Sequence, residues 1–140
     1  METHCGDRVF IVEDSPLIRS RLIELLGEID GVCVVGEAQS PYEAVAGIRR
    51  TQPNCVILDL HLIGGSGIDV LRTVHSHSPG IAFVVLTAHS TAQYRRACMQ
   101  AGASRFLDKS TEFDKLKEVV IDCIGRDSCG RHESNQQRGE

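Results

Sequence analysis

Residues 9–16 read Val9-Phe10-Ile11-Val12-Glu13-Asp14-Ser15-Pro16, and they carry two different structural signals in succession. Its first half is apolar without alternation, which is typical of a strand buried on both faces of a parallel sheet. Its second half places two carboxylates where that strand ends. Ser15 and Pro16 then supply a helix N-cap and a first helical residue. The sequence therefore predicts a strand, an acidic turn and a helix in direct succession.

The same alternation of strand and helix continues along the chain. Four further short apolar runs occur at 32–35, 55–58, 81–86 and 105–107. Between and after the runs, helical spacing or capping residues predict helices at about 16–29, 41–48, 68–74, 91–101 and 113–124. Strands that alternate with helices at this spacing form βαβ units with right-handed crossovers. We therefore predict an α/β fold with one five-stranded parallel sheet covered by helices on both faces.

The composition is that of one globular domain. The chain has 140 residues, of which 41% are hydrophobic and 24% charged, and its formal net charge is −4. Its longest apolar run is far shorter than the roughly 20 residues of a membrane-spanning helix, and residues 1–7 lack the pattern of a secretory signal. The mild acidity argues against a free-standing nucleic-acid binder. Residues 126–140 are polar, so we expect a domain at 1–125 followed by a flexible tail or the start of a linker.

The six cysteines show neither zinc-site spacing nor an evident pairing. No two are spaced Cys-x-x-Cys, and no histidine follows at zinc-finger spacing. Four lie in apolar segments, where a free thiol behaves as a small hydrophobe: Cys33, Cys55, Cys98 and Cys123. Without a secretory signal, we expect reduced thiols and a cytoplasmic protein.

Chemically useful side chains follow four of the five predicted strands. Ligands of open α/β sheets bind outside the carboxyl ends of the strands. The residues at those ends are Glu13 and Asp14, Asp59, Thr87, and Lys109. Three neighbouring carboxylates repel one another unless a cation holds them, and oxygen ligands combined with a phosphate suit Mg²⁺. Lys109 can balance the remaining charge or pair with a phosphate. The remaining strand end, at 36–38, shows no such chemistry.

These motifs are specific in their order and spacing, although none is specific alone. They are residues 12–16, Leu58-Asp59-Leu60 with Gly67 eight residues after the aspartate, Leu86-Thr87-Ala88, and residues 102–109. In this arrangement the chain resembles the receiver domain of two-component response regulators over residues 8–125. The resemblance implies a doubly wound, flavodoxin-like (βα)5 fold with strand order 2-1-3-4-5.

The resemblance also implies roles at the predicted acidic site. Asp59 would accept a phosphoryl group from a sensor histidine kinase or a phosphotransfer protein. Mg²⁺ would be held by Asp14, Asp59 and the main-chain carbonyl of His61, and Glu13 would act mostly through water. The physics agrees, because a carboxylate is a recognised covalent nucleophile and phosphoryl transfer needs mainly positioning and charge stabilisation.

The resemblance further implies a switch. Thr87 and Lys109 would each contact a phosphoryl oxygen, and Phe106 would turn inward when Thr87 moves toward the phosphoryl group. The changed protein–protein surface would lie around residues 91–125. The alternative explanation of Phe106 is a buried aromatic residue of a strand, since aromatic residues favour strands for packing reasons alone.

Two positions depart from the family pattern. A proline usually follows the site lysine and forms a cis bond, whereas Ser110 follows Lys109. Because cis bonds before residues other than proline are rare, this argues against a cis bond here. A proline is also common four residues after the acceptor, where this chain has Ile63 followed by Gly64-Gly65. We expect a looser loop after Asp59 as a result.

Two histidines lie near the predicted site. His61 stands two residues after Asp59, and His89 stands two residues after Thr87. In the family these positions flank the phosphoryl group and influence the rate of its loss, so both are candidates for tuning that rate. They are otherwise ordinary solvent-facing histidines. A zinc site of His61, His89 and Glu13 is a further alternative.

Other functions share parts of this pattern. A Mg²⁺-dependent aspartyl phosphohydrolase typically has a second aspartate two residues after its nucleophile, where this chain has His61. The chain could also be the receiver half of a transcription factor. A DNA-binding domain would have to follow residue 125, where this chain has only a polar tail, so the chain by itself cannot read DNA. A flavodoxin-like redox role has no support in the sequence. We expect a phosphoacceptor signalling domain that catalyses only its own phosphotransfer and dephosphorylation, without membrane or direct DNA contact. Homodimerisation stays open.

Overall fold

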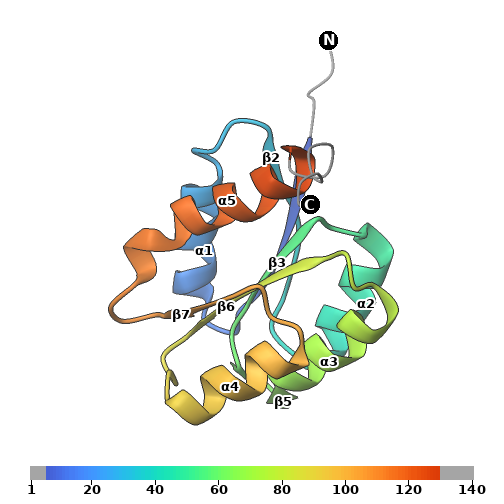
Figure 1. The fold of residues 1–140 in the computed structure, drawn as a ribbon, viewed down its shortest axis with the longest axis vertical. Coiled ribbons are helices and arrows are strands. Elements are labelled where there is room, and N and C mark those ends of the chain that lie inside the picture. Colours follow the sequence, from blue (N-terminus) through green and yellow to red (C-terminus); the bar gives the residue numbers. More distant parts are fainter. Residues whose placement is uncertain (1–5, 130–140) are drawn as a thin grey trace, which may run out of the picture.

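A computed structural model describes residues 6–129 and contains a five-stranded parallel sheet (Figure 1). Its strands are β1 (Asp7–Val12), β2 (Val32–Ala38), β3 (Cys55–Leu58), β6 (Ala82–Thr87) and β7 (Arg105–Asp108). They lie in the order β2-β1-β3-β6-β7, and every neighbouring pair is parallel. Counted within this sheet alone, the order is 2-1-3-4-5, which confirms the predicted flavodoxin-like fold.

Helices cover both faces of the sheet. They are α1 (Pro16–Leu26), α2 (Pro41–Thr51), α3 (Gly67–His77), α4 (Ala92–Ala101) and α5 (Leu116–Cys129), with a 3-10 turn, η1 (Phe113–Lys115), before the last. In Figure 1, α1 and α5 lie on one side of the sheet, and α2, α3 and α4 lie on the other. No helix in the described part of the chain has both the length and the apolar character needed to cross a bilayer.

The core consists of two layers separated by the sheet. In β1, Val9 and Ile11 pack with side chains of α1 and α5, whereas Phe10 and Val12 pack with side chains of α2, α3 and α4. All four are at most 1% exposed. Full burial of one such side chain contributes about 1.5–3 kcal/mol relative to leaving it in water. The apolar run Val9-Phe10-Ile11-Val12 is therefore a strand buried on both faces, as predicted.

Local sequence sets where the helices begin and end. The hydroxyl of Ser15 accepts a hydrogen bond from the amide of Ile18 at 3.3 Å, and Pro16 occupies the first helical position of α1. Ser40 and Pro41 do the same for α2. At the end of α4, Gly102 adopts a left-handed conformation (φ 114°) that a residue with a side chain rarely adopts. The cap at Ser15 thus ends the turn that carries Glu13 and Asp14, and Gly102 ends α4 shortly before β7.

The segment after Asp59 is more ordered than its sequence predicts. Strands β4 (His61–Leu62) and β5 (Gly65–Ser66) form an antiparallel hairpin instead of the expected loose loop. Gly64 supplies the positive φ (86°) that the tight turn needs. The hairpin is also tied to the β2–α2 loop, because the amide of Ile63 donates to the carbonyl of Gln39 at 3.1 Å. The expectation of a loose loop was therefore wrong.

One cysteine and the last helix differ from what the sequence predicts. Cys33 lies half-buried on the edge strand β2 and is disulfide-bonded, so the expectation that it is a buried free thiol was wrong. Cys55, Cys98 and Cys123 are buried as expected. Helix α5 continues to Cys129, four residues past residue 125, the predicted end of the domain. Residues 130–140 of that tail lie outside the described part of the chain, and its flexibility stays a prediction.

Candidate functional site

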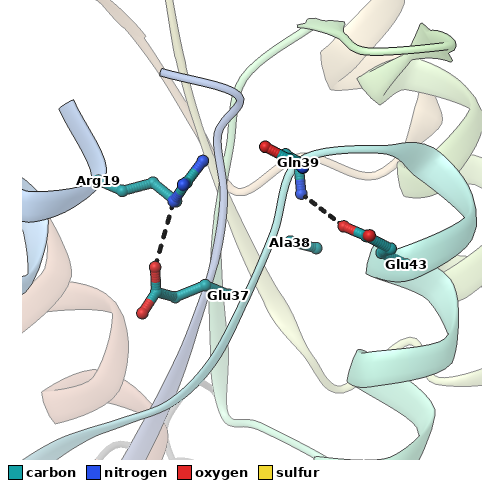
Figure 2. Close-up of a pocket in the computed structure, with 5 residues that line it drawn as sticks. All are labelled: Arg19, Glu37, Ala38, Gln39 and Glu43. Atoms are coloured by element: carbon teal, nitrogen blue, oxygen red, sulfur yellow. Dashed lines mark hydrogen bonds and ion pairs between the residues drawn. The ribbon is translucent and has the colours of Figure 1, made fainter. Parts of the chain in front are cut away.

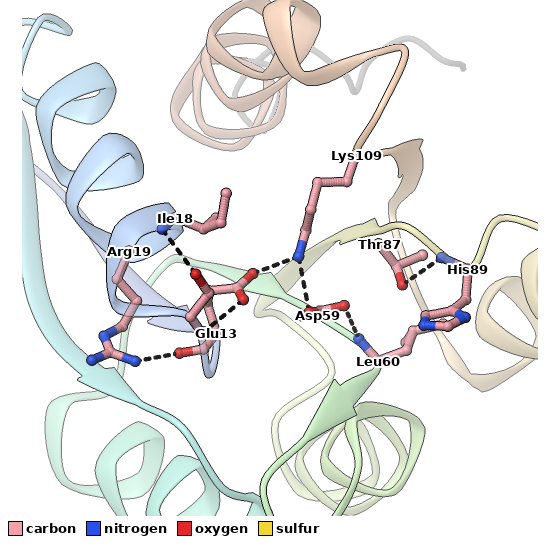
Figure 3. Close-up of polar contacts among 9 residues, drawn as sticks. Glu13, Ile18, Arg19, Asp59, Leu60, Thr87, His89 and Lys109 are labelled. Atoms are coloured by element: carbon pink, nitrogen blue, oxygen red, sulfur yellow. Dashed lines mark hydrogen bonds and ion pairs between the residues drawn. The ribbon is translucent and has the colours of Figure 1, made fainter.

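The side chains at the strand ends converge at one edge of the sheet (Figure 3). Glu13 follows β1, Asp59 follows β3, Thr87 ends β6, and Lys109 follows β7. Parallel strands in register place these four positions side by side, although up to 96 residues of chain separate them. The structure thus brings together the residues that the strand ends predicted.

Lys109 is the centre of the polar contacts. Its ammonium nitrogen Nζ lies 2.9 Å from Glu13 Oε1 and 3.0 Å from Asp59 Oδ2. Glu13 is 2% exposed and Asp59 is 6% exposed, so both carboxylates are largely withdrawn from water. A lysine between two buried carboxylates offsets part of their mutual repulsion and of their desolvation cost.

Burial and neighbouring charges shift two pKa values in this group. Burial raises the pKa of Glu13, and the nearby charge of Asp59 adds to the rise. Hydrogen bonds from Lys109 and from the amide of Ser15 oppose that rise without cancelling it. For Lys109, burial would lower the pKa, but the bonds to Glu13 and Asp59 outweigh burial and raise it. Lys109 is therefore held in its charged form.

The three carboxylates could hold a hard divalent cation. One oxygen each from Glu13, Asp14 and Asp59 lies within 4.8 Å of the others. These donors are all oxygens, which suits Mg²⁺, and Asp14 is less buried than its two neighbours, which leaves an open side for water or phosphate. Within residues 6–129 no group of three potential ligands includes a histidine, so the alternative zinc site of His61, His89 and Glu13 was wrong.

The acceptor candidate and its neighbours are held by main-chain contacts. Asp59 Oδ1 accepts a hydrogen bond from the amide of Leu60 at 2.7 Å, while Oδ2 faces Lys109. The hydroxyl oxygen of Thr87, which is fully buried, accepts from the amide of His89 at 3.2 Å. The amide of Lys109 donates to the carbonyl of Thr87 at 2.8 Å. Hydrogen bonds to the main chain thus hold the loops that carry Asp59, Thr87 and Lys109 next to one another.

A shallow pocket at the end of β2 adds a residue that the sequence argument missed (Figure 2). The guanidinium of Arg19 pairs with Glu37 at 3.2 Å and donates to the main-chain carbonyl of Glu13 at 2.7 Å. The strand end at 36–38, which showed no chemistry in the sequence, thus anchors the turn that carries Glu13. Arg19 lies inside α1, and no sequence signal connects it to Glu37.

Three rings gather beside the acceptor. The imidazoles of His61 and His89 stack with centroids 3.6 Å apart. The ring of Tyr94 meets them edge-on at 6.0 Å and 6.3 Å. Both histidines are exposed, as expected for loop residues. Their mutual contact and the third ring could not be read from the sequence, because they join the β4–β5 hairpin, the β6–α4 loop and α4.

Phe106 is a buried strand residue in this structure. It is 5% exposed, and the guanidinium of Arg95 lies over its ring at 4.7 Å. Arg95 also donates to the carbonyl of Phe106 at 3.4 Å. The aromatic residue is thus linked to α4 directly, and its predicted part in a switch stays a prediction.

Comparison with known proteins places the chain in a family. The response regulator receiver domain matches residues 9–121. The chain is 33% identical over 115 residues to the DNA-binding transcriptional activator DevR/DosR of Mycobacterium tuberculosis, covering 82% of this chain and 53% of that protein. The chain therefore spans about half the length of the curated relatives it matches.

Solved structures of receiver domains have the same fold as this chain. The signal receiver domain of the response regulator NarL from Mycobacterium tuberculosis is 29% identical, with a TM-score of 0.78 over 84% of this chain and 95% of that one. The receiver domain of the sensor histidine kinase PA1611 from Pseudomonas aeruginosa shares the fold, with 24% identity, a TM-score of 0.74 and coverage of 86% and 98%. That receiver holds a magnesium ion in its active site cleft. With the family matched from residue 9 to residue 121, this chain belongs to the response regulator receiver domains, which are phosphorylation-dependent signalling modules.

Proposed function

We propose that this chain accepts a phosphoryl group on Asp59 from a histidine kinase or a phosphotransfer protein, with the help of Mg²⁺. The observation that carries the proposal is the position of the Asp59 carboxylate. It lies among the three clustered carboxylates and 3.0 Å from Lys109 Nζ, with Thr87 on the neighbouring strand. An aspartate that merely followed a strand would face water instead of this set of groups.

The chemistry follows from these contacts. An oxygen of Asp59 attacks the phosphorus of a phosphohistidine, the P–N bond breaks, and its electron pair stays on the imidazole, which takes up a proton. Mg²⁺, when bound to the acidic oxygens, would neutralise charge on the phosphoryl oxygens. Lys109, whose ammonium contacts the carboxylates of Glu13 and Asp59, turns to one phosphoryl oxygen, and the Thr87 hydroxyl donates to another. Asp14, Asp59 and the carbonyl of His61 would hold the ion, and Glu13 would act through water.

The ring cluster supports a role in the lifetime of the phosphorylated form. His61 and His89 stack beside the acceptor, and Tyr94 closes one side of the pair. His61 stands two residues after Asp59, and the amide of His89 donates to Thr87, so the stacked rings belong to the two loops that border the acceptor. We infer that the two imidazoles set the rate of dephosphorylation by shielding or orienting that water.

The output surface is inferred to lie around residues 91–125. Thr87 sits at the start of the β6–α4 loop, and a shift of its side chain toward a phosphoryl oxygen would alter the loop. Phe106, on the neighbouring strand, is joined to α4 through Arg95. A change at Thr87 therefore has a physical route to the surface of α4, by which a protein partner would distinguish the two states.

The further biology belongs to the same proposal. We infer a cytoplasmic signalling module with a sensor kinase upstream and a protein partner downstream. The relative DevR/DosR is DNA-binding, and this chain corresponds to about half of it. DNA binding by this chain would thus require a further domain. Dimerisation on phosphorylation is an open alternative for the output.

The experiment is intact mass spectrometry after incubation with acetyl phosphate, with and without Mg²⁺. We expect one phosphoryl adduct that depends on Mg²⁺, is absent from Asp59→Asn and persists in the control Asp69→Asn, whose carboxylate is exposed on α3. The decay of the adduct should accelerate or slow in His61→Ala and His89→Ala. An adduct on Asp59→Asn would refute the proposed acceptor. Steady turnover of a phosphomonoester would favour a phosphohydrolase instead.

A further inference from the structure

Asp108 is not part of the acidic cluster, yet both of its carboxylate oxygens accept hydrogen bonds. It is the last residue of β7 and immediately precedes Lys109. Its Oδ1 accepts hydrogen bonds from the amide of Ser110 at 2.8 Å, the hydroxyl of Ser110 at 2.6 Å and the amide of Thr111 at 3.3 Å. Its Oδ2 accepts a hydrogen bond from the hydroxyl of Ser90. One carboxylate thus engages residues from two different loops.

The main chain of Asp108 is fixed as well. Its amide donates to Glu112 Oε1 at 2.8 Å, and its carbonyl accepts from the amide of Glu112 at 2.8 Å. The segment from Asp108 to Glu112 is therefore a closed turn with hydrogen bonds at both ends. Lys109 is its second residue, so the direction in which the lysine leaves the strand is set by this turn.

The turn occupies the place where the family pattern has a proline. Ser110 stands there instead, and the described residues contain no cis peptide bond. A proline restrains the chain through its ring, which fixes φ. Here hydrogen bonds to one carboxylate provide the restraint. A side chain that holds the following two residues in this way is the usual device of aspartate in turns.

The contact with Ser90 joins the turn to the second loop of the site. Ser90 lies in the β6–α4 loop, three residues after Thr87. The two loops are also joined by the hydrogen bond from the amide of Lys109 to the carbonyl of Thr87. The residues expected to contact the phosphoryl group are therefore held relative to each other by one side-chain bond and one main-chain bond.

The charge state of Asp108 agrees with this arrangement. Hydrogen bonds from Ser110 and Ser90 lower the pKa of Asp108 to about 2. At neutral pH the side chain is therefore ionised and can only accept hydrogen bonds. This matches the groups around it, which all donate.

We propose that Asp108 is a positioning residue that fixes Lys109 and, through Ser90, the loop of Thr87 for binding a phosphoryl group. The inference rests on the proposed function, because it concerns the geometry of the same site. Asp108 touches neither the acidic cluster nor Asp59 among the described contacts, so it acts through Lys109 and Ser90. Its loss should therefore weaken phosphoryl binding much more than Mg²⁺ binding.

The test measures two affinities separately. Beryllofluoride, a mimic of the phosphoryl group, is titrated in the presence of Mg²⁺ and followed by fluorine NMR, and Mg²⁺ alone is titrated by calorimetry. We expect Asp108→Ala to weaken beryllofluoride binding about tenfold, the scale of a lost positioning contact, while Mg²⁺ affinity changes less than about twofold. Asp108→Asn should recover part of the loss, because its amide oxygen still accepts from Ser110 and Thr111.

Two further variants make the result interpretable. Ser90→Ala removes only the side-chain contact between the two loops and lies outside the turn from Asp108 to Glu112. It should give a smaller loss of beryllofluoride affinity, again with little change in Mg²⁺ affinity. Asp114→Ala removes an exposed carboxylate in η1 and should match the wild type. Their amide NMR spectra verify that each variant is folded, so Ser90→Ala still decides the matter if Asp108→Ala does not fold.

The outcomes separate the two proposals. Wild-type affinity for beryllofluoride in both Asp108→Ala and Ser90→Ala would overturn the positioning role and leave the proposed function intact. Equal losses of Mg²⁺ and beryllofluoride affinity would also overturn it, because they would reveal a general structural role. A wild-type protein that binds Mg²⁺ but no beryllofluoride, and forms no adduct with acetyl phosphate, would overturn both.

Discussion

At the scale of single residues, the site combines charged groups, each of which would destabilise the folded protein if it were buried without a partner. Glu13 and Asp59 lie buried beside each other, and Lys109 stands between them. The raised pKa of Glu13 shows that this compensation is incomplete, because burial and the charge of Asp59 outweigh Lys109 and the amide of Ser15. An acidic site kept ready for a cation thus lowers the stability of the cation-free protein.

The pH dependence of stability follows from the raised pKa of Glu13. A carboxyl whose pKa is higher in the folded state costs stability when it is ionised in both states, and costs nothing when it is protonated in both. Without Mg²⁺, Glu13→Gln should therefore be more stable than the wild type at pH 7. The gain should vanish as the pH falls below the ordinary value of 4.5.

Urea denaturation across this pH range measures the effect. Glu24→Gln, an exposed position of α1, is the control and should change little at any pH. A gain for Glu13→Gln that does not vary with pH would contradict the explanation and point to packing instead of ionisation.

At the scale of elements, the start of α3 is placed by a close approach between backbones. A Cβ atom on Gly67 would overlap the main-chain carbonyl oxygen of Asp59, and the amide of Gly67 donates to the carbonyl of Leu60 at 2.8 Å. Helix α3 can therefore begin in contact with the main chain of Asp59 only if residue 67 lacks a side chain. This gives a structural reason for a glycine eight residues after the acceptor.

Gly67→Ala should consequently disturb both stability and the site. Overlap with backbone atoms cannot be relieved by a rotamer change, so we expect a loss of about 1–3 kcal/mol in the free energy of unfolding. The adduct with acetyl phosphate should also form more slowly, because Asp59 is displaced. The matched control is Gly80→Ala, where a Cβ atom would meet nothing within 4 Å. Equal stabilities for the two variants, measured by chemical denaturation, would disprove this account.

At the scale of the whole molecule, the acidic site lies at the end of the two strands that contribute side chains to both core layers. Strand β1 contributes to both layers and precedes Glu13, and β3 contributes to both layers and precedes Asp59. A ligand at this edge therefore contacts only the folded chain, because the carboxylates come together only when the sheet forms. Binding there must stabilise the entire domain by mass action.

Mg²⁺ should thus raise the thermal stability of the protein. At a concentration about 100 times its dissociation constant, a ligand specific for the folded state adds about 2.7 kcal/mol. Thermal unfolding in Mg²⁺ should therefore occur a few degrees higher than in a chelator. Asp14→Asn should lose this difference, whereas Asp69→Asn on the exposed face of α3 should keep it. Identical melting temperatures with and without Mg²⁺ in the wild type would argue against the site.

Much of this protein follows from its sequence alone, because the signals involved are local. The apolar runs, the Ser-Pro caps and Gly102 determined the order of strands and helices, which depends on the residues within each segment. The residues at the strand ends followed from that order, since parallel strands share an edge. The sequence thereby determined the fold and the set Glu13, Asp14, Asp59, Thr87 and Lys109.

Only the tertiary structure decided how these residues are paired and supported. Lys109 reaches Glu13 across 96 residues of chain, and Ser90 reaches Asp108 across 18. The Arg19–Glu37 pair and the stack of His61 on His89 likewise join separate elements. Such contacts depend on the distances between elements after packing, and no periodicity within one segment encodes those distances. The types of residue at the site can be read from single segments, whereas the contacts between them depend on how the segments pack together.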